Sequence, residues 1–190
     1  MSDQATLVIA IAAVVVLGLV GWAVWAGMKR RRATALHDRF GPEYARAREQ
    51  FGKKAEQELE KRVERVHRLH LRPLGAEARD SFAAAWHTAQ ARFVDDPQLS
   101  VAEADRLIMD VMEARGYPMT DFERRAADIS VEHPHVVSDY RAAHAIAERS
   151  RRREASTEDL REAMIHYKAL FQDLLATGAP EQVEVRQARM

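Results

Sequence analysis

The hydrophobic and polar positions of this 190-residue chain form one long apolar run followed by a series of amphipathic segments. Residues 5–28 are 24 positions without a charged side chain. A helix of that length is about 36 Å long, which exceeds the roughly 30 Å hydrocarbon core of a bilayer. The pattern predicts a transmembrane helix within an N-terminal segment that covers residues 1–28.

The charges on either side of this run indicate a retained anchor. A cleaved signal peptide begins with cations and has an apolar stretch of about 7 to 15 residues, whereas only Asp3 is charged before this run. Cations near a span favour the cytoplasmic side, and four follow the run: Lys29, Arg30, Arg31 and Arg32. We therefore expect a single-pass protein of the plasma membrane, with its N-terminus outside and its C-terminal domain in the cytoplasm.

The same segment contains the residues expected at the membrane interface. Trp22 and Trp25 lie near the inner end of the run, where indole rings are enriched, and the four cations follow them. Residues 29–72 carry 14 basic and 7 acidic side chains, residues 73–135 have a net charge of −6, and residues 136–190 are neutral. We expect the basic segment to lie near a lipid bilayer with anionic inner-leaflet headgroups, at about 1 kcal/mol per suitably placed cation.

Residues 29–72 are interpreted as a basic juxtamembrane segment with a long amphipathic stalk helix. Pro42 is suited to a first helical turn, and the helix is expected to continue to about His70, weakened at Gly52. Such a segment is typical of a stalk, of one strand of a coiled coil, or of a helix laid along a bundle, so dimerisation through it is a hypothesis. Its apolar stripe is narrow and comprises Tyr44, Ala47, Phe51, Ala55, Leu59, Val63 and Val66.

Residues 73–178 are predicted to form a small helical bundle, followed by a flexible tail over residues 179–190. The spacing of apolar residues predicts helices over 76–94, from 101 to Gly116, from 121 to about 128, from about 134 to 152, and from 156 to Gly178. Ser100 and Glu103 have the spacing of a capping box at one helix start. Since no segment alternates apolar and polar residues, the predicted fold class is all-α.

Several kinds of chemistry have no support in the sequence. The absence of cysteine excludes disulfides and thiolate metal sites, and the dispersed glycines exclude phosphate-binding and dinucleotide loops. The basic run from Arg149 to Arg153 has no interleaved aromatic residues and adjoins an acidic segment, so we expect no nucleic-acid partner.

Histidine and aspartate are the remaining candidates for a metal or catalytic site. Two histidine pairs have spacings compatible with metal ligands, namely His67 with His70 and His133 with His135. Four carboxylates are candidates for acid–base catalysis, namely Asp95, Asp96, Asp105 and Asp110. Arginines surround the first histidine pair, and the carboxylates fit a turn and the solvent-facing side of a helix. The sequence therefore assigns no metal ligand, no cofactor and no catalytic residue.

Some short segments of the sequence are similar to those of a known protein family. The segments "RFGPEY", "ARFVDDP", "VAEADRLI", "FERRAADIS" and "YRAAHAIAERS" occur between residues 37 and 175. These segments resemble those of a family of uncharacterised bacterial single-pass membrane proteins with a helical cytoplasmic domain. The resemblance implies a bacterial inner membrane and supplies no active-site residue, because the family has no assigned activity.

Two classes of function remain open from the sequence. The first is a membrane-anchored helical protein-interaction or self-assembly module, whose partner is another protein or a second copy. The alternative is a small metal-dependent or carboxylate/histidine enzyme or regulator within the bundle. Convergence of His133, His135 or His144 with carboxylates in a pocket favours the second class.

Overall fold

The described part of the protein is helical. The computed structural model describes residues 19–22, 28 and 34–176, and the chain divides into two compact units, Met1–Arg39 and Phe40–Met190. The described residues of the second unit form helices, turns and loops but no strand. The predicted all-α helical bundle is therefore confirmed for this unit.

The second unit contains seven α-helices and one 3-10 turn among its described residues. They are α2 (Pro42–Phe51), the 3-10 turn η1 (Gly52–Lys54), α3 (Ala55–His67), α4 (Ala76–Arg92), α5 (Pro97–Arg115), α6 (Phe122–Glu132), α7 (Val137–Arg151) and α8 (Thr157–Ala176).

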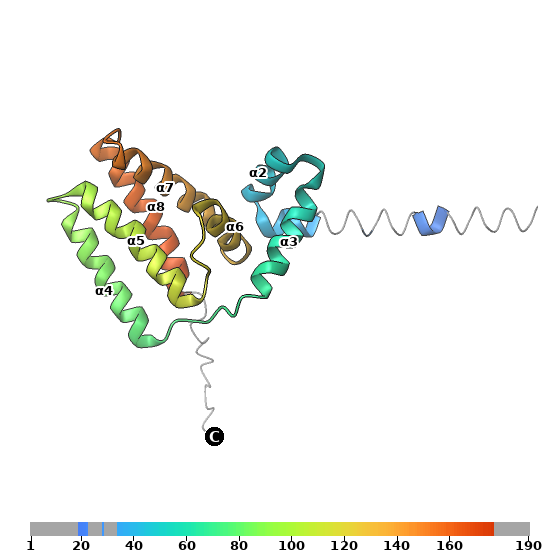
Figure 1. Cartoon of the computed structure of the whole chain (residues 1–190), viewed down its shortest axis with the longest axis horizontal. Coiled ribbons are helices and arrows are strands. Elements are labelled where there is room, and N and C mark those ends of the chain that lie inside the picture. Colours follow the sequence, from blue (N-terminus) through green and yellow to red (C-terminus); the bar gives the residue numbers. More distant parts are fainter. Residues whose placement is uncertain (1–18, 23–27, 29–33, 177–190) are drawn as a thin grey trace, which may run out of the picture. The chain divides into compact units, whose positions relative to one another are not determined.

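Four helices surround the main core. α8 packs against both α5 and α7, and α4 packs against α5, so these helices lie alongside one another in Figure 1. Ile108, Tyr140, Tyr167 and Leu170 are completely buried in this core. The amphipathic stripes predicted from the sequence thus face one another, as burial of apolar surface requires.

The start of α5 differs from the predicted capping box. The helix begins at Pro97, and the Asp96 side chain caps it by accepting a hydrogen bond from the Leu99 N–H at 3.0 Å. Ser100 lies inside the helix, where its hydroxyl donates to the Ala89 carbonyl at 2.7 Å. The reason is that Asp96 followed by proline is itself a complete helix start, which leaves Ser100 to connect α5 to α4.

The predicted long stalk helix is wrong, because the segment is broken in two. Gly52 has φ +56, a left-handed conformation that glycine adopts without steric cost, and here the chain turns so that α2 packs against α3. α3 also packs against α6. Ala47, Leu59 and Val66 are consequently buried inside the unit, and the narrow apolar stripe serves internal packing.

The predicted N-terminal transmembrane helix is also corrected. Within the described residues, no helix is both long enough and apolar enough to cross a membrane. This finding overturns the fold class with a membrane anchor and the single-pass inner-membrane localisation.

The predicted membrane-interface residues fall largely outside the described part of the chain. Trp22 is described and is exposed. Trp25, Lys29, Arg30, Arg31 and Arg32 lie outside the described residues, as do positions 5–18 and 23–27 of the expected span.

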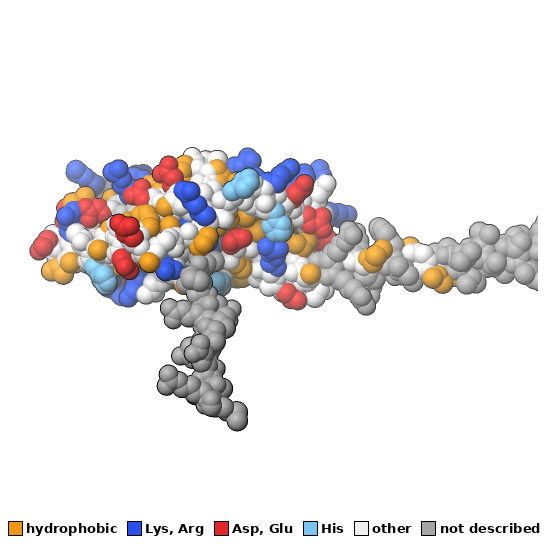
Figure 2. All heavy atoms as spheres, turned by 90° about the horizontal axis from the view of Figure 1, so that it is seen from below, with side chains coloured by type: hydrophobic (Ala, Val, Ile, Leu, Met, Phe, Trp, Pro, Cys, Tyr) orange, Lys and Arg blue, Asp and Glu red, His pale blue; other side chains and the backbone are white. Residues whose placement is uncertain are grey.

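Basic and acidic side chains, which are segregated along the sequence, are mixed on one face of the described structure. On the face shown in Figure 2, basic, acidic and apolar side chains are interspersed over the described part of the molecule. Folding brings the basic stretch before residue 72 against the acidic α6, as in the ion pair between Arg65 and Asp128 at 2.6 Å. Local cavities are therefore more informative about binding than the charge of whole segments.

Candidate interaction site

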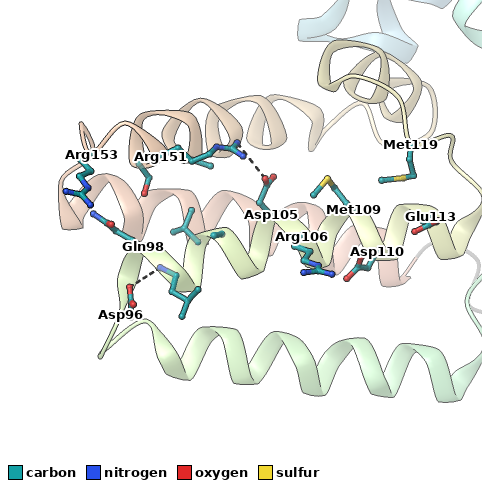
Figure 3. Close-up of a pocket in the computed structure, with 15 residues that line it drawn as sticks. Asp96, Gln98, Asp105, Arg106, Met109, Asp110, Glu113, Met119, Arg151 and Arg153 are labelled. Carbon is teal, nitrogen blue, oxygen red and sulfur yellow. Dashed lines mark hydrogen bonds and ion pairs between the residues drawn. The ribbon is translucent and has the colours of Figure 1, made fainter.

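An open groove of about 830 Å³ lies between α5 and the end of α7. We call it the Asp105 groove. Figure 3 shows Arg151 and Arg153 at one end of the groove and Met109 and Met119 at the other. Charged side chains of both signs line it, so the groove has no single preference for the charge of a ligand.

Asp105 is the buried charge of this groove, with 7% of its surface exposed. Tyr167 donates a hydrogen bond of 2.7 Å to its carboxylate, while His144 Nδ1 and Arg151 Nη2 each lie 3.9 Å from a carboxylate oxygen. Burial raises the pKa of Asp105, but His144 and Tyr167 together outweigh this effect, and the pKa lies below its ordinary value of 3.8. Asp105 is thus an ionised link between α5 and α8 that offers little accessible surface for acid–base chemistry.

His133 and His135 converge on one carboxylate, that of Asp173 on α8. His133 Nδ1 bonds to Asp173 and its Nε2 lies 3.0 Å from Arg115 Nη1, while His135 Nε2 lies 3.0 Å from Asp173 Oδ1. Because arginine can only donate, Nε2 of His133 accepts and its proton resides on Nδ1. Burial lowers the pKa of His133 against the opposing effect of Asp173, so the ring is held neutral.

This histidine cluster has the contacts of a structural network. Both ring nitrogens of His133 are engaged by protein groups, and the side chain is completely buried, so neither nitrogen is available to a metal or a substrate. His67 and His70, the other predicted pair, are both exposed. Among the described residues, no group of three or more histidine, aspartate or glutamate side chains has the geometry to hold a metal ion.

The remaining predicted carboxylates have simple structural positions. Asp96 caps α5, and Asp95 and Asp110 are exposed. They are not brought together with Asp105 into a paired carboxylate site, although Asp96 and Asp110 also line the Asp105 groove.

A second groove runs along the outer surface between α4 and α8, and we call it the Trp86 groove. It consists of two adjoining cavities of about 560 Å³ and 300 Å³, which share Trp86, Gln90 and Lys168. Trp86 from α4 stacks on Phe171 from α8, with 4.8 Å between ring centroids and 20° between planes. This aromatic pair forms the floor at which the two cavities meet.

The walls of the Trp86 groove are apolar and partly solvent-exposed. Val94 and Ile165 are 86% and 51% exposed, which is high for large apolar side chains. Exposed apolar surface that gathers in one groove is typical of a binding site. The apolar lining residues are Ala83, Trp86, Phe93, Val94, Met164, Ile165, Phe171, Leu175 and Ala176.

The charged residues that line this groove all have the same sign. They are Arg79, Arg161 and Lys168, and the described lining includes no aspartate or glutamate. Arg161 is already bound by Glu158 at 2.6 Å, whereas Arg79 and Lys168 form no ion pair with the described residues. In addition, the buried Trp86 indole nitrogen has no hydrogen-bond partner within the described structure. The groove therefore combines an apolar floor with two uncompensated cations.

The sequence contained part of this information. Trp86 lies within the helix predicted over residues 76–94, but periodicity alone does not distinguish a residue in the core from one in a surface groove. Asp173 carried no signal at all, because it lies 40 positions after His133 and they meet only when α8 packs.

Comparisons of the chain with protein-family models, with curated proteins and with solved structures find no match. The resemblance to a bacterial membrane-protein family stays a prediction.

Proposed function

We propose that this protein is a helical protein-interaction module whose Trp86 groove binds an amphipathic helix with acidic flanks. The observation that carries the proposal is the coincidence of an apolar floor with a purely basic rim in one groove. Helices commonly bind in such grooves through apolar side chains spaced three and four residues apart.

The dimensions of the groove agree with this ligand. The lining extends from Arg79 in α4 to Val94 just beyond its end, and from Ala176 back to Arg161 along α8. About fifteen helical residues span roughly 22 Å, or four turns. A short helix of the partner can therefore lie along the groove and contact Val94, Phe171 and Ile165 with one face.

The charges select between possible partners. A helix with glutamates beside its apolar face places carboxylates near Arg79 and Lys168, whereas one with lysines meets like charges. Exposed pairs contribute at most about 1 kcal/mol each, so two such contacts correspond to about a tenfold difference in Kd. The apolar floor supplies affinity, and the rim supplies charge specificity.

The proposal is tested with designed peptides and the full chain. A fluorescent amphipathic helix of about sixteen residues, long enough to fill the groove, is made with glutamate flanks, and its twin carries lysine flanks. Anisotropy titrations are expected to show binding of the acidic peptide about tenfold tighter than binding of its twin, with weakening as salt rises. Equal affinity for both peptides, or no binding of either, contradicts the proposal.

Two substitutions locate the binding to the groove. Ile165→Glu places a carboxylate on the groove wall and should abolish binding of the acidic peptide. Met119→Glu is the matched control, because Met119 is similarly exposed at 43% but lines the Asp105 groove. Equal loss of binding in both variants places the peptide elsewhere and overturns the assignment to the Trp86 groove.

The other form of the hypothesis is self-assembly, in which the occupant of the groove is a second copy of the chain. Sedimentation of the full chain and of its Ile165→Glu variant, both in detergent-free buffer, distinguishes a second copy of the chain from an acidic partner helix. Dimerisation that Ile165→Glu removes assigns the groove to self-association and contradicts the proposed acidic partner.

A further inference from the structure

A smaller cavity of about 290 Å³ lies between α2, α3, α6 and α7. Five arginines line it, and we call it the arginine pocket. They come from four different helices and are Arg46, Arg62, Arg65, Arg124 and Arg141. The pocket lies apart from the Trp86 groove, with which it shares no lining residue.

Two of these arginines are fully engaged by carboxylates. Arg141 donates to Glu43 at 3.0 Å and to Glu123 at 2.7 Å. Arg65 donates to Asp128 from both Nε, at 2.8 Å, and Nη2, at 2.6 Å. These two guanidinium groups therefore have strong charge-assisted partners and hold the surrounding helices together.

Arg62 is different, because it is buried without such a partner. Only 5% of its surface is exposed, and its Nε and Nη1 form no hydrogen bond within the described structure. Its nearest carboxylate oxygen, on Glu43, lies 3.7 Å from Nη1, beyond hydrogen-bond distance. Burying a charged donor without an acceptor is costly, so this pocket contains a cation whose hydrogen-bonding requirement is unmet.

Two further cations at the pocket have spare capacity. Arg46 on α2 is exposed and lies 3.9 Å from Glu123, also beyond hydrogen-bond distance. The Arg124 side chain on α6 is exposed and has no hydrogen bond or ion pair with the described residues. Arg46, Arg62 and Arg124 thus present donors from three helices around one small cavity.

The carboxylates at the pocket, with Asp128 that binds Arg65, equal its five arginines in number but leave two donors of Arg62 without a hydrogen bond. Four line it, namely Glu43, Glu58, Asp121 and Glu123. Arg141 binds Glu43 and Glu123, and Asp121 accepts from the Arg124 N–H at the start of α6. Glu58 remains as the carboxylate that opposes an incoming anion.

We propose that the arginine pocket binds a phosphate group, either as the free ion or as a monoester. Donors from three helices suit a tetrahedral oxyanion, whereas a planar carboxylate is normally held by one arginine fork. A bound phosphate supplies acceptors to the unpaired donors of Arg62. The cavity also has room for a small substituent on the phosphorus.

Thermal unfolding of the full chain tests this assignment. Inorganic phosphate, phenyl phosphate and acetate are each titrated against sodium chloride at constant ionic strength. At a concentration of about 100 Kd, phosphate is expected to raise Tm by roughly 5 °C or more, while acetate leaves it near the chloride value. A larger effect of phenyl phosphate identifies a monoester as the preferred ligand, and a larger effect of inorganic phosphate identifies the free ion.

Substitutions of the lining residues test whether phosphate raises Tm by binding in the arginine pocket, and whether each residue strengthens or weakens that binding. Arg62→Met removes the unpartnered guanidinium and should eliminate the phosphate-dependent shift, whereas Glu58→Gln removes the opposing charge and should lower Kd several-fold. Arg46→Gln and Arg124→Gln, both at exposed positions, should each weaken binding even if Arg62→Met does not fold. Arg106→Gln, an exposed arginine of the Asp105 groove, is the matched control and should bind phosphate normally.

Two results would contradict a phosphate site in the arginine pocket. A phosphate shift no larger than that of chloride, or one that survives in Arg46→Gln and Arg124→Gln, overturns the site. Peptide binding to the Trp86 groove is measured in the same variants and is expected to be unchanged, so failure of either proposal is seen independently of the other.

Discussion

At the scale of single residues, some of the polar groups buried in the bundle form hydrogen bonds between helices. Tyr167 on α8 donates to Asp105 on α5, and burial raises the pKa of Tyr167 far above its ordinary value of 10.0. The phenol therefore stays protonated and remains a donor at any physiological pH. Such a bond matters chiefly because its loss leaves a buried charge without a partner.

Tyr167→Phe is expected to lower the free energy of unfolding by about 1 to 3 kcal/mol. The phenylalanine ring fills the same space, so the loss reports on the Asp105 carboxylate rather than on a cavity. Urea denaturation measures the change, with Tyr44→Phe as control, because the Tyr44 bond to Glu56 is half-buried and 3.3 Å long. Similar small effects for both substitutions contradict a special role for the Asp105 bond.

His133 predicts a dependence of stability on pH. Its folded pKa lies below the ordinary value of 6.5, so below that pH the unfolded chain binds a proton more readily than the folded one. Stability from this group is complete above pH 6.5 and is lost as pH falls from 6.5 toward the folded pKa. His133→Gln should flatten this dependence between about pH 7.5 and 5.5 in urea unfolding, whereas the exposed His87→Gln should keep the wild-type slope.

At the scale of elements, helix ends are determined by a few local residues. Gly116 ends α5 with φ +95, and a Cβ at this position would lie 3.1 Å from the carbonyl oxygen of His70. The sequence predicted this end correctly, since glycine just beyond a helix and Pro118 soon after form a standard stop.

Gly116→Ala should therefore destabilise the protein by more than about 1 kcal/mol, through both the left-handed backbone and the close carbonyl. Gly75→Ala is the control, because Gly75 has an ordinary φ of −65 and no atom lies within 4 Å of the position that a Cβ would occupy there. That variant should be neutral or stabilised by about 0.4 to 1 kcal/mol. Thermal unfolding of the pair checks both directions.

The helices of the bundle were predictable, whereas the break at Gly52 and the grooves were not. Apolar stripes and caps report on local structure, which is why α4, α7 and α8 begin and end within a few residues of their expected positions. The turn at Gly52 depends on α2 packing against α3 and α7, a tertiary effect that overrides local helix preference. The Trp86 groove likewise requires knowledge of which helix lies beside α4.

At the scale of the whole molecule, two ionic connections join the α2–α3 segment to the bundle. Arg65 bonds to Asp128 on α6, which is almost completely buried, and Arg141 on α7 bonds to Glu43 on α2. Breaking a buried pair by removing one partner is much more costly than replacing both partners by apolar residues.

Arg65→Met should thus cost about 3 kcal/mol or more, because it removes the partner of the buried Asp128 carboxylate. The double variant Arg65→Met with Asp128→Leu should recover most of this loss. Urea unfolding of the four members of the cycle measures the coupling. Additive effects of the two substitutions contradict a direct ionic connection between α3 and α6.

The bond between Glu43 and Arg141 has a consequence for synthesis on the ribosome. The two residues are 98 positions apart, so at about 5 to 20 residues per second Glu43 is made roughly 5 to 20 s before its partner exists. For most of that interval α2 and α3 have each other but neither α6 nor α7 to pack against. The earliest part of this unit to be translated therefore waits for most of the chain before its neighbours α6 and α7 are made, and α5 and α7 wait longer still for α8.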